Sequence, residues 1–220
     1  MVEKQDFKNT YCWYKDVCDL DNCTNCIRYN EMRYLVDESG IPFNRQYPDE
    51  LIAGVDIEAF TLLAEIKDDI LNFVNNGESL YIASENTGNG KTSWSIKLML
   101  KYFDSIWAGN GFRVRGMFIH VPTLLNQLKN FQNPLSELYK QNILNCDLVV
   151  WDDIGSNYLS NYDNSQLISY IDQRVFNQKA NIYTGNLVDE YQFKQLLGDR
   201  LFSRIYKYST IVIFKGKDRR

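Results

Sequence analysis

The sequence has no long apolar segment, little net charge and a single histidine. No run of apolar residues approaches the ~20 that a membrane-spanning helix needs, and residues 1–5 are not typical of a signal peptide. We therefore expect a cytoplasmic protein with no membrane partner. The formal net charge of −4 argues against a protein that coats nucleic acid, so DNA contact would need a local basic surface. The lone His120 is expected to pack or to cap a helix rather than to catalyse.

The chain also lacks internal repeats and low-complexity tracts. Its 220 residues are 45% hydrophobic, which is enough for one α/β core with a small appendage. Residues 1–35 hold four of the five cysteines. Residues 36–55 contain glycines and prolines that break regular structure and are predicted to be a linker. Residues 56–220 are predicted to form the main domain.

A glycine-rich loop between an apolar run and an amphipathic segment predicts a phosphate-binding site. The loop follows residues 80–83 and precedes a helix predicted from residue 91. Backbone N–H groups of such a loop face the phosphates, Lys91 reaches the β and γ groups, and the Thr92 hydroxyl can ligate Mg²⁺. Glu85 replaces the usual first glycine and must point away from the phosphates. The alternative is a glycine-rich turn ahead of an ordinary helix. The expected nucleotide-binding residues are Thr87, Gly88, Asn89, Gly90, Lys91, Thr92 and Ser93.

A second motif puts two carboxylates at the end of a buried strand. Asp152 and Asp153 end an apolar run that begins after Asp147. Ligands of open parallel sheets bind at the carboxyl ends of the strands. Asp152 is expected to hold Mg²⁺, directly or through water, and Asp153 to polarise the water that attacks the γ-phosphate. Capping of the next helix is the alternative. Together the two motifs predict a nucleotide-hydrolysing core.

Apolar runs alternate with amphipathic segments throughout the main domain. A first helix is predicted over residues 60–73, and Asn133 is expected to cap the helix that starts at residue 134. The alternation predicts an α/β fold, a three-layer α/β/α sandwich with a five-stranded parallel sheet. The predicted strands are 80–83, 114–121, 147–151, 181–184 and 210–214, and the further helices are 91–107, 122–131, 134–145, 163–178 and 189–197.

Two polar features follow the fourth predicted strand. Asn186 comes directly after it, where its amide would orient the attacking water; a turn-forming Gly-Asn pair is the alternative. Arg200 and Arg204 are four residues apart and so share one helical face. An arginine supplied to a neighbouring subunit stabilises the charge that develops on the γ-phosphate. The alternative is that the two arginines only form a solvated basic face of the helix.

Four motifs of the chain resemble those of AAA+ helicase loaders of the DnaC/DnaI type. They are the loop GNGKT, the strand LVVWDDIG, the turn TGN and the segment GDRLFSRI. They are also similar to the IstB transposition ATPases and, more distantly, to the DnaA initiator. The resemblance covers residues 56–214 and implies an AAA+ P-loop ATPase without the C-terminal helical lid of typical AAA+ proteins. By this resemblance the catalytic residues are Lys91 of Walker A, Asp152 and Asp153 of Walker B, Asn186 of sensor 1 and the arginine finger Arg204, with Arg200 as second choice.

The cysteines near the N-terminus predict a metal site. Cys12, Cys18, Cys23 and Cys26 are spaced C-x5-C-x4-C-x2-C. In a cytosolic chain thiolates favour metal binding over disulfides, and four of them can close a tetrahedral Zn²⁺ site. An iron–sulfur cluster and free thiols are the alternatives, and Cys146 is expected in the core. A zinc module at residues 1–35 is similar to that of DnaI-type loaders, in which it grips the helicase, and phages of Gram-positive hosts carry comparable proteins. A phage-encoded version would work in the host cytoplasm.

These features predict an ATPase that loads a hexameric, DnaB-type replicative helicase onto single-stranded DNA. The expected cofactors are ATP, Mg²⁺ and Zn²⁺, and self-assembly is expected because Arg204 would serve a neighbour's site. One alternative is an IstB-like transposition helper on duplex DNA. Another is a zinc-bearing helicase adaptor or inhibitor with negligible turnover. Candidate DNA contacts are Lys129, Lys140, Tyr158, Tyr162, Tyr170 and the basic tail 215–220.

Overall fold

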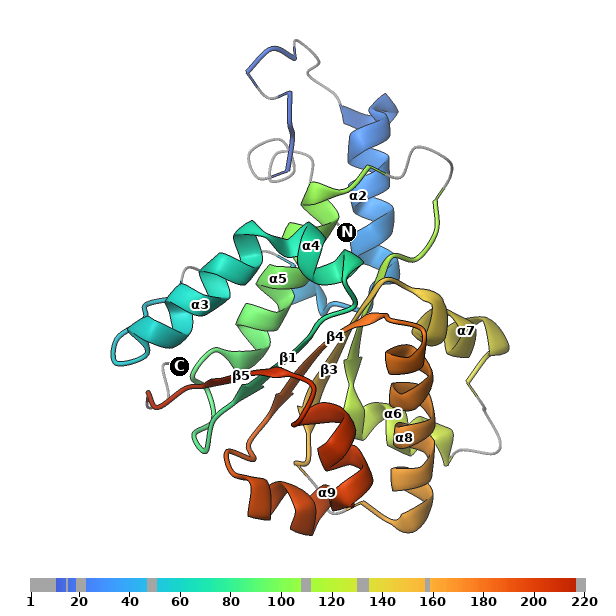
Figure 1. Ribbon diagram of the computed structural model, residues 1–220. Coiled ribbons are helices and arrows are strands. Elements are labelled where there is room, and N and C mark those ends of the chain that lie inside the picture. Colours follow the sequence, from blue (N-terminus) through green and yellow to red (C-terminus); the bar gives the residue numbers. More distant parts are fainter. Residues whose placement is uncertain are drawn as a thin grey trace.

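The computed structural model describes residues 11–14, 16–18, 23–46, 51–107, 112–129, 135–156 and 159–216. A five-stranded parallel sheet lies at its centre, in the strand order β2-β3-β4-β1-β5 (Figure 1). The sheet confirms the predicted fold class, because each predicted strand overlaps an observed one. The strands are β1 (Ser79–Ala83), β2 (Gly116–His120), β3 (Leu148–Ile154), β4 (Ala180–Gly185) and β5 (Thr210–Ile213).

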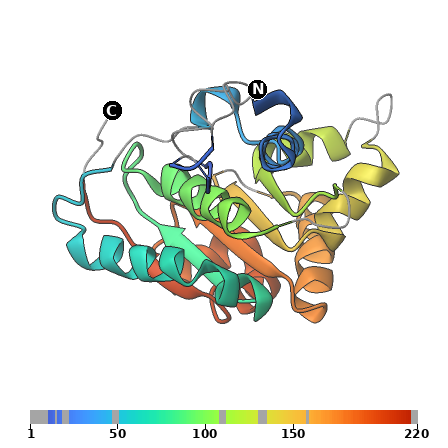
Figure 2. The same cartoon turned by 90° about the horizontal axis from the view of Figure 1, so that it is seen from above.

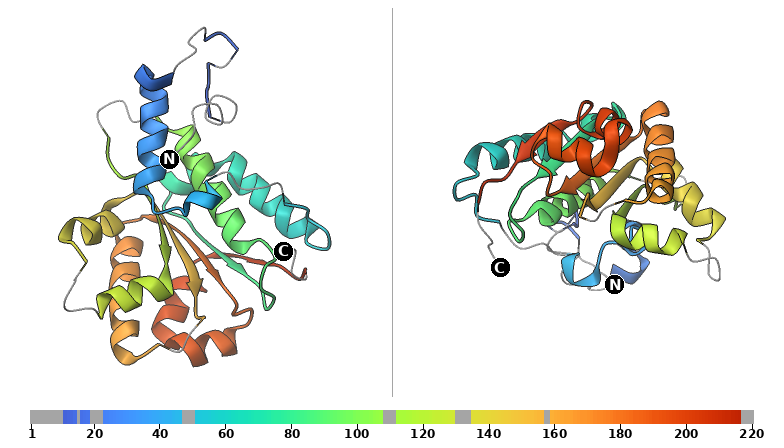
Figure 3. Two further views of the ribbon diagram at one scale, coloured as in Figure 1. Left: turned by 180° about the vertical axis from the view of Figure 1, so that it is seen from behind. Right: turned by 90° about the horizontal axis from the view of Figure 1, so that it is seen from below.

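Helices cover both faces of the sheet. Successive strand side chains point to opposite faces, so Leu80 and Ile82 join one hydrophobic cluster while Tyr81 and Ala83 join the other. The first cluster includes side chains of α2 to α5, and the second includes side chains of α6 to α9 (Figure 2 and Figure 3). The three-layer sandwich is therefore confirmed. The helices are α2 (Ile27–Glu38), α3 (Ile57–Asp68), α4 (Ile70–Asn75), α5 (Lys91–Ser105), α6 (Val121–Leu128), α7 (Glu137–Asn145), α8 (Asn161–Phe176) and α9 (Glu190–Ile205).

Helix ends depart from the prediction where local capping decides them. The predicted cap Asn133 lies outside the described residues. Helix α7 begins at Glu137, and its N-cap is Ser136, whose side chain accepts a hydrogen bond from the N–H of Tyr139. Helix α9 continues beyond the predicted end at residue 197, through a kink at Gly198. Gly198 has φ 81, a left-handed conformation that favours glycine. The part of α9 that follows the kink carries the two arginines on successive helical turns.

The N-terminal helix α2 packs on the main domain. Its side chains Met32 and Leu35 are buried in the same cluster as α5. Arg28, only 1% exposed, donates hydrogen bonds to the carbonyl oxygens of Asp104 (2.9 Å) and Ile106 (3.1 Å) at the end of α5. A module ending at residue 35, followed by a linker, was the expectation. Within the described residues, however, α2 crosses residue 35 and shares the core, because its apolar face is covered by α5.

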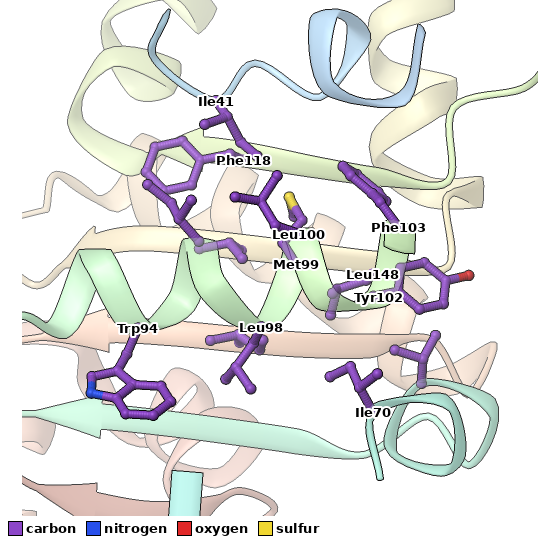
Figure 4. Close-up of a cluster of buried hydrophobic side chains, with 14 of the residues drawn as sticks. Ile41, Ile70, Trp94, Leu98, Met99, Leu100, Tyr102, Phe103, Phe118 and Leu148 are labelled. Carbon is purple, nitrogen blue, oxygen red and sulfur yellow. The ribbon is translucent and has the colours of Figure 1, made fainter. Parts of the chain in front are cut away.

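Helix α5 buries one face in the hydrophobic core. Leu98, Met99 and Phe103 are each 0% exposed. In Figure 4 these side chains of α5 lie between Ile41 and Phe118 on one side and Ile70 on the other. This packing fixes the helix whose first turn follows the phosphate loop.

Among the described residues, none of the helices has the length and apolar character that a membrane-spanning segment needs.

Candidate nucleotide-binding site

The loop between β1 and α5 has the backbone form of an anion site. Gly88 (φ 70) and Gly90 (φ 102) both adopt conformations that side chains disfavour. Gly90 is the N-cap of α5, so the unpaired N–H groups of the first helical turn point away from the helix toward the loop. A Cβ atom at Gly90 would also approach Cδ1 of Leu51 to 3.3 Å. Glycine at this position therefore serves both the turn and the close approach of another segment.

Polar groups within the loop hold its shape. The side-chain amide of Asn89, 1% exposed, donates a short hydrogen bond to Oγ of Ser84. Nζ of Lys91 donates to the carbonyl oxygen of Asn86 over 2.8 Å. The Asn86 side chain donates in turn to the carbonyl oxygen of Gly216 over 3.1 Å. The C-terminal segment that follows β5 therefore braces the phosphate loop.

Asp152 is a buried carboxylate that links three elements. It is 7% exposed at the end of β3, and its Oδ1 accepts hydrogen bonds from Thr92 (2.8 Å) and Thr184 (2.7 Å). Burial raises the pKa of Asp152 above its ordinary value, and the bonds from Thr184 and Thr92 oppose that rise. Thr184, at the end of β4, was not among the predicted site residues. Its position one residue before the glycine of the TGN turn was the only signal in the sequence.

Asp153 has an unusual backbone and faces the only histidine. Its φ is 63, and its N–H donates to Oγ1 of Thr184 over 3.0 Å. Its Oδ2 lies 3.8 Å from Nε2 of His120, whose Nδ1 is 2.8 Å from Oγ1 of Thr123. The expectation that His120 packs or caps is therefore incomplete: it precedes α6 and contacts Thr123, but it also reaches Asp153. The useful signal was its place at a strand end, since His120 pairs with Asp152 in the sheet register.

One open cavity of ≈ 500 Å³ collects these groups, a size within the usual range for small-molecule sites. All seven predicted loop residues line it, together with Asp152, Asp153 and Asn186. Glu85 is exposed and does not line it, in keeping with a carboxylate that points away. Arg45 and Leu51, from the predicted linker, also line the cavity and were missed. Composition alone marked that segment only as irregular.

The predicted arginine finger lies away from this cavity. Arg204 and Arg200 border a separate hollow of ≈ 180 Å³ with Ile168, Asp199 and Ser203. Nε of Arg204 forms a short ion pair with Oδ1 of Asp172 on α8. The two arginines do share one helical face, as their spacing predicts, because both contact the Asp172 carboxylate. Neither arginine lines the cavity of its own chain.

The structure does not show the expected four-cysteine zinc site. Among the described residues, which include all four of these cysteines, no group of three or more His, Cys, Asp or Glu side chains could hold a metal ion. Cys23 is instead buried in the hydrophobic cluster, with Cys12 and Cys26 packed against it. Cys23 begins a short 3₁₀ turn, Cys23–Asn25, and Cys26 is the N-cap of α2 that follows it. Cys146 is buried, as expected.

Comparison with known proteins agrees with the geometry of the cavity. The family described as "IstB-like ATP binding protein" matches residues 61–220 of the chain. The chain belongs to this family. Membership in this family supports ATP binding by this IstB-like protein. No curated protein matches the chain.

Solved structures share the AAA+ fold of this IstB-like protein. The crystal structure of the DnaC helicase loader has a TM-score of 0.63 at 22% identity, over 83% of this chain and 99% of that chain. A crystal structure of DnaI has a TM-score of 0.64 at 17% identity, over 79% and 94%. AMPPCP-bound DnaA from Aquifex aeolicus has a TM-score of 0.55 at 15% identity, over 75% of this chain and 48% of that chain. These likenesses confirm the fold that the sequence motifs implied.

Proposed function

We propose that this IstB-like protein is an ATPase that loads a replicative DNA helicase onto single-stranded DNA and hydrolyses ATP between its own subunits. The observation that carries the proposal is the composition of the cavity. It combines a phosphate loop with two carboxylates and an amide, yet its own arginine pair, Arg200 and Arg204, lies elsewhere. A site of this kind is completed by an arginine from a neighbour.

The cavity residues have distinct roles in the proposed hydrolysis. Lys91 neutralises the β and γ phosphates, and the N–H groups at the start of α5 bind their oxygens. Asp153 accepts a hydrogen bond from the attacking water and draws its proton, while the amide of Asn186 fixes the water's orientation. These two side chains line the same cavity, from β3 and from the end of β4.

The donor set beside the loop fits Mg²⁺. Oγ1 of Thr92 and Oδ1 of Asp152 lie 2.8 Å apart, and hydroxyl and carboxylate oxygens are the ligands that this hard cation prefers. Bound there, Mg²⁺ would neutralise charge on the phosphates. Thr184 donates to the same carboxylate oxygen and so keeps the Asp152 side chain aimed at Thr92.

The helicase-loading part of the proposal is supported by the fold shared with DnaC and DnaI. It is also supported by a surface suited to single-stranded DNA. Lys140, Tyr162 and Tyr170 line one cavity of ≈ 220 Å³ between α6, α7 and α8. The exposed ring of Tyr162 suits stacking with a base, whereas Tyr170 is buried and Lys140 is paired with Glu137. Lys129 is paired with Asp163 over 2.8 Å, and Tyr158 lies outside the described residues.

A second candidate function is that of a transposition helper, which the name of the matching family favours. Such a protein binds duplex DNA and recruits a transposase. A helicase adaptor without turnover is less well supported, because Glu85 was its main argument and that side chain lies outside the cavity.

A loading assay separates these functions. The purified protein is mixed with a hexameric replicative helicase and a single-stranded DNA circle, which offers no free end for threading. We expect the protein to bind the helicase, to hydrolyse ATP with DNA and helicase present, and to raise the amount of helicase on the circle. Lys91→Ala is the control that lacks each ATP-dependent step.

Other outcomes of this assay contradict the proposal. Binding to duplex DNA without any binding to the helicase would favour the transposition helper. Helicase binding without detectable hydrolysis, with or without DNA, would favour the adaptor.

A further inference from the structure

The proposed trans arginine, Arg204, shares an acidic partner with Arg200. Asp172, on α8, uses one carboxylate oxygen for each arginine. Its Oδ1 forms the short pair with Nε of Arg204, and its Oδ2 lies 3.5 Å from Nη2 of Arg200. The carboxylate thus bridges two consecutive turns of α9 from the neighbouring helix, and α8 and α9 lie side by side (Figure 1).

The atoms that make these contacts differ between the two arginines. A guanidinium carries five N–H donors in a planar fork. Arg204 uses only the Nε–H, and within the described residues it makes no other hydrogen bond, so both terminal nitrogens keep their donors. Terminal nitrogens are the pair that binds two phosphate oxygens at once. Arg200 instead uses a terminal nitrogen, at the long limit of such a contact, and its side chain is 77% exposed.

We propose that Asp172 is the positioning residue for Arg204. Its carboxylate grips the Nε edge of the guanidinium and directs the two terminal nitrogens outward, toward the γ-phosphate of ATP bound in the neighbouring subunit. This inference rests on the proposed function, in which Arg204 acts in trans.

The physical need for such a residue follows from the exposure of the finger. The Arg204 side chain is 42% exposed at the edge of an open hollow, and a free arginine there would sample many rotamers. Donors that stabilise developing charge are effective when they are already oriented before the reaction. An ion pair through Nε restricts the side chain without consuming the donors that the phosphate needs.

The opposite role would be sequestration, in which Asp172 competes with the phosphate for Arg204. Sequestration would be expected to engage the terminal nitrogens, and the contact at Nε leaves them uncovered. The two roles predict opposite effects of removing the carboxylate: loss of hydrolysis for positioning, and gain for sequestration.

The test compares Asp172→Ala with Arg204→Ala in complementation with Lys91→Ala. We expect Asp172→Ala to bind ATP and to assemble as the wild type, and to hydrolyse at least about tenfold more slowly, within the ~10²-fold range that a 1 Å misplacement can cost. Asp172→Asn keeps an oxygen acceptor for Nε–H and should recover part of the rate. The double variant Asp172→Ala/Arg204→Ala should be no slower than Arg204→Ala alone.

Mixing then locates the defect. Lys91→Ala has a damaged pocket but an intact Arg204 and Asp172, so an excess of it should restore hydrolysis in the pockets of Asp172→Ala. A defect in the pocket or fold of Asp172→Ala itself would not be restored. Glu190→Ala removes another ion pair of α9, the one with Lys194, and serves as the matched control with unchanged hydrolysis.

The outcomes distinguish this inference from the proposed function. Wild-type or faster hydrolysis by Asp172→Ala overturns the role of Asp172 alone, provided that Arg204→Ala is inactive and is rescued by Lys91→Ala. Failure of Lys91→Ala to rescue Asp172→Ala, where it does rescue Arg204→Ala, overturns that role as well. If Arg204→Ala itself hydrolyses ATP normally, the trans arrangement fails, and the role of Asp172 fails with it.

Discussion

Oγ1 of Thr92 donates a hydrogen bond to Oδ1 of Asp152 over 2.8 Å, and this bond joins the first turn of α5 to the end of β3. Because these two oxygens suit one Mg²⁺ ion, we expect Thr92→Val to raise the Mg²⁺ concentration for half-maximal hydrolysis by about tenfold, or ~1.4 kcal/mol of binding free energy. Valine keeps the shape of threonine and removes the oxygen. Ser93→Ala, one residue along, should leave the Mg²⁺ requirement nearly unchanged. Equal Mg²⁺ curves for Thr92→Val and wild type would contradict the assignment.

Two substitutions in the cavity should separate ATP binding from its hydrolysis. Lys91→Ala should weaken ATP binding, because it removes the cation beside the β and γ phosphates. Asp153→Asn should bind ATP but not hydrolyse it, because the amide cannot draw a proton from the water. Asparagine tolerates the left-handed backbone of residue 153, so the loss cannot be attributed to strain. Binding is measured with a fluorescent ATP analogue and hydrolysis by phosphate release. Wild-type turnover by Asp153→Asn would refute its role.

Arg45 should contribute to nucleotide binding although it lies in the segment that was predicted to be a linker. It lines the same cavity as the phosphate loop. A hydrogen bond from a charged group contributes about 1.5–3 kcal/mol, so we expect Arg45→Ala to weaken ATP binding by about tenfold or more. Hydrolysis at saturating ATP should change little. Arg33→Ala, which removes an exposed arginine of α2 paired with Asp37, is the control. Equal ATP affinities for the two variants would place Arg45 outside the binding site.

Arg28 should be important for the stability of the folded chain. It is buried, donates to the end of α5, and its guanidinium lies 4.0 Å from the ring centre of Trp13. Arg28→Met should lower the free energy of unfolding by about 3–5 kcal/mol, because it removes the ion pairs with Glu31 and Asp104 and the hydrogen bond to the carbonyl oxygen of Ile106. Arg33→Met breaks a surface pair and should cost less than about 1 kcal/mol. Urea unfolding followed by circular dichroism measures both. Similar losses of unfolding free energy in Arg28→Met and Arg33→Met would show that α2 is not anchored through Arg28.

The phosphate loop and the buried strand could be predicted because each is continuous in the chain. Gly88 and Gly90 supply the turn, and Lys91 and Thr92 follow it directly, so their chemistry needs no distant residue. The acidic pair Asp152–Asp153 follows from the same logic, as it ends an apolar run. Distant neighbours could not be predicted in this way. His120, Thr184 and Arg45 reach the cavity only because separate segments meet there.

The cysteines show the limit of spacing as evidence. Cys23 and Cys26 have the separation of a metal-binding pair. Two cysteines with this separation can also lie in the turn that begins a helix, as they do here. In the structure Cys23 is buried in the hydrophobic cluster to which α5 also contributes, and Arg28 of α2 donates to the end of α5. The same packing joined the predicted N-terminal module to the main domain.

The parallel sheet, the phosphate loop and the acidic strand end follow from local patterns in the chain, because periodic burial and short motifs act over a few neighbouring residues. The set of groups that line the cavity and the contacts of Arg204 depend on how distant segments pack together. Asp172 and Arg204 are 32 residues apart in the chain, and nothing local to either one specifies the other. Their contact exists because α8 and α9 pack on the same face of the sheet, and such packing depends on the shapes of many side chains at once.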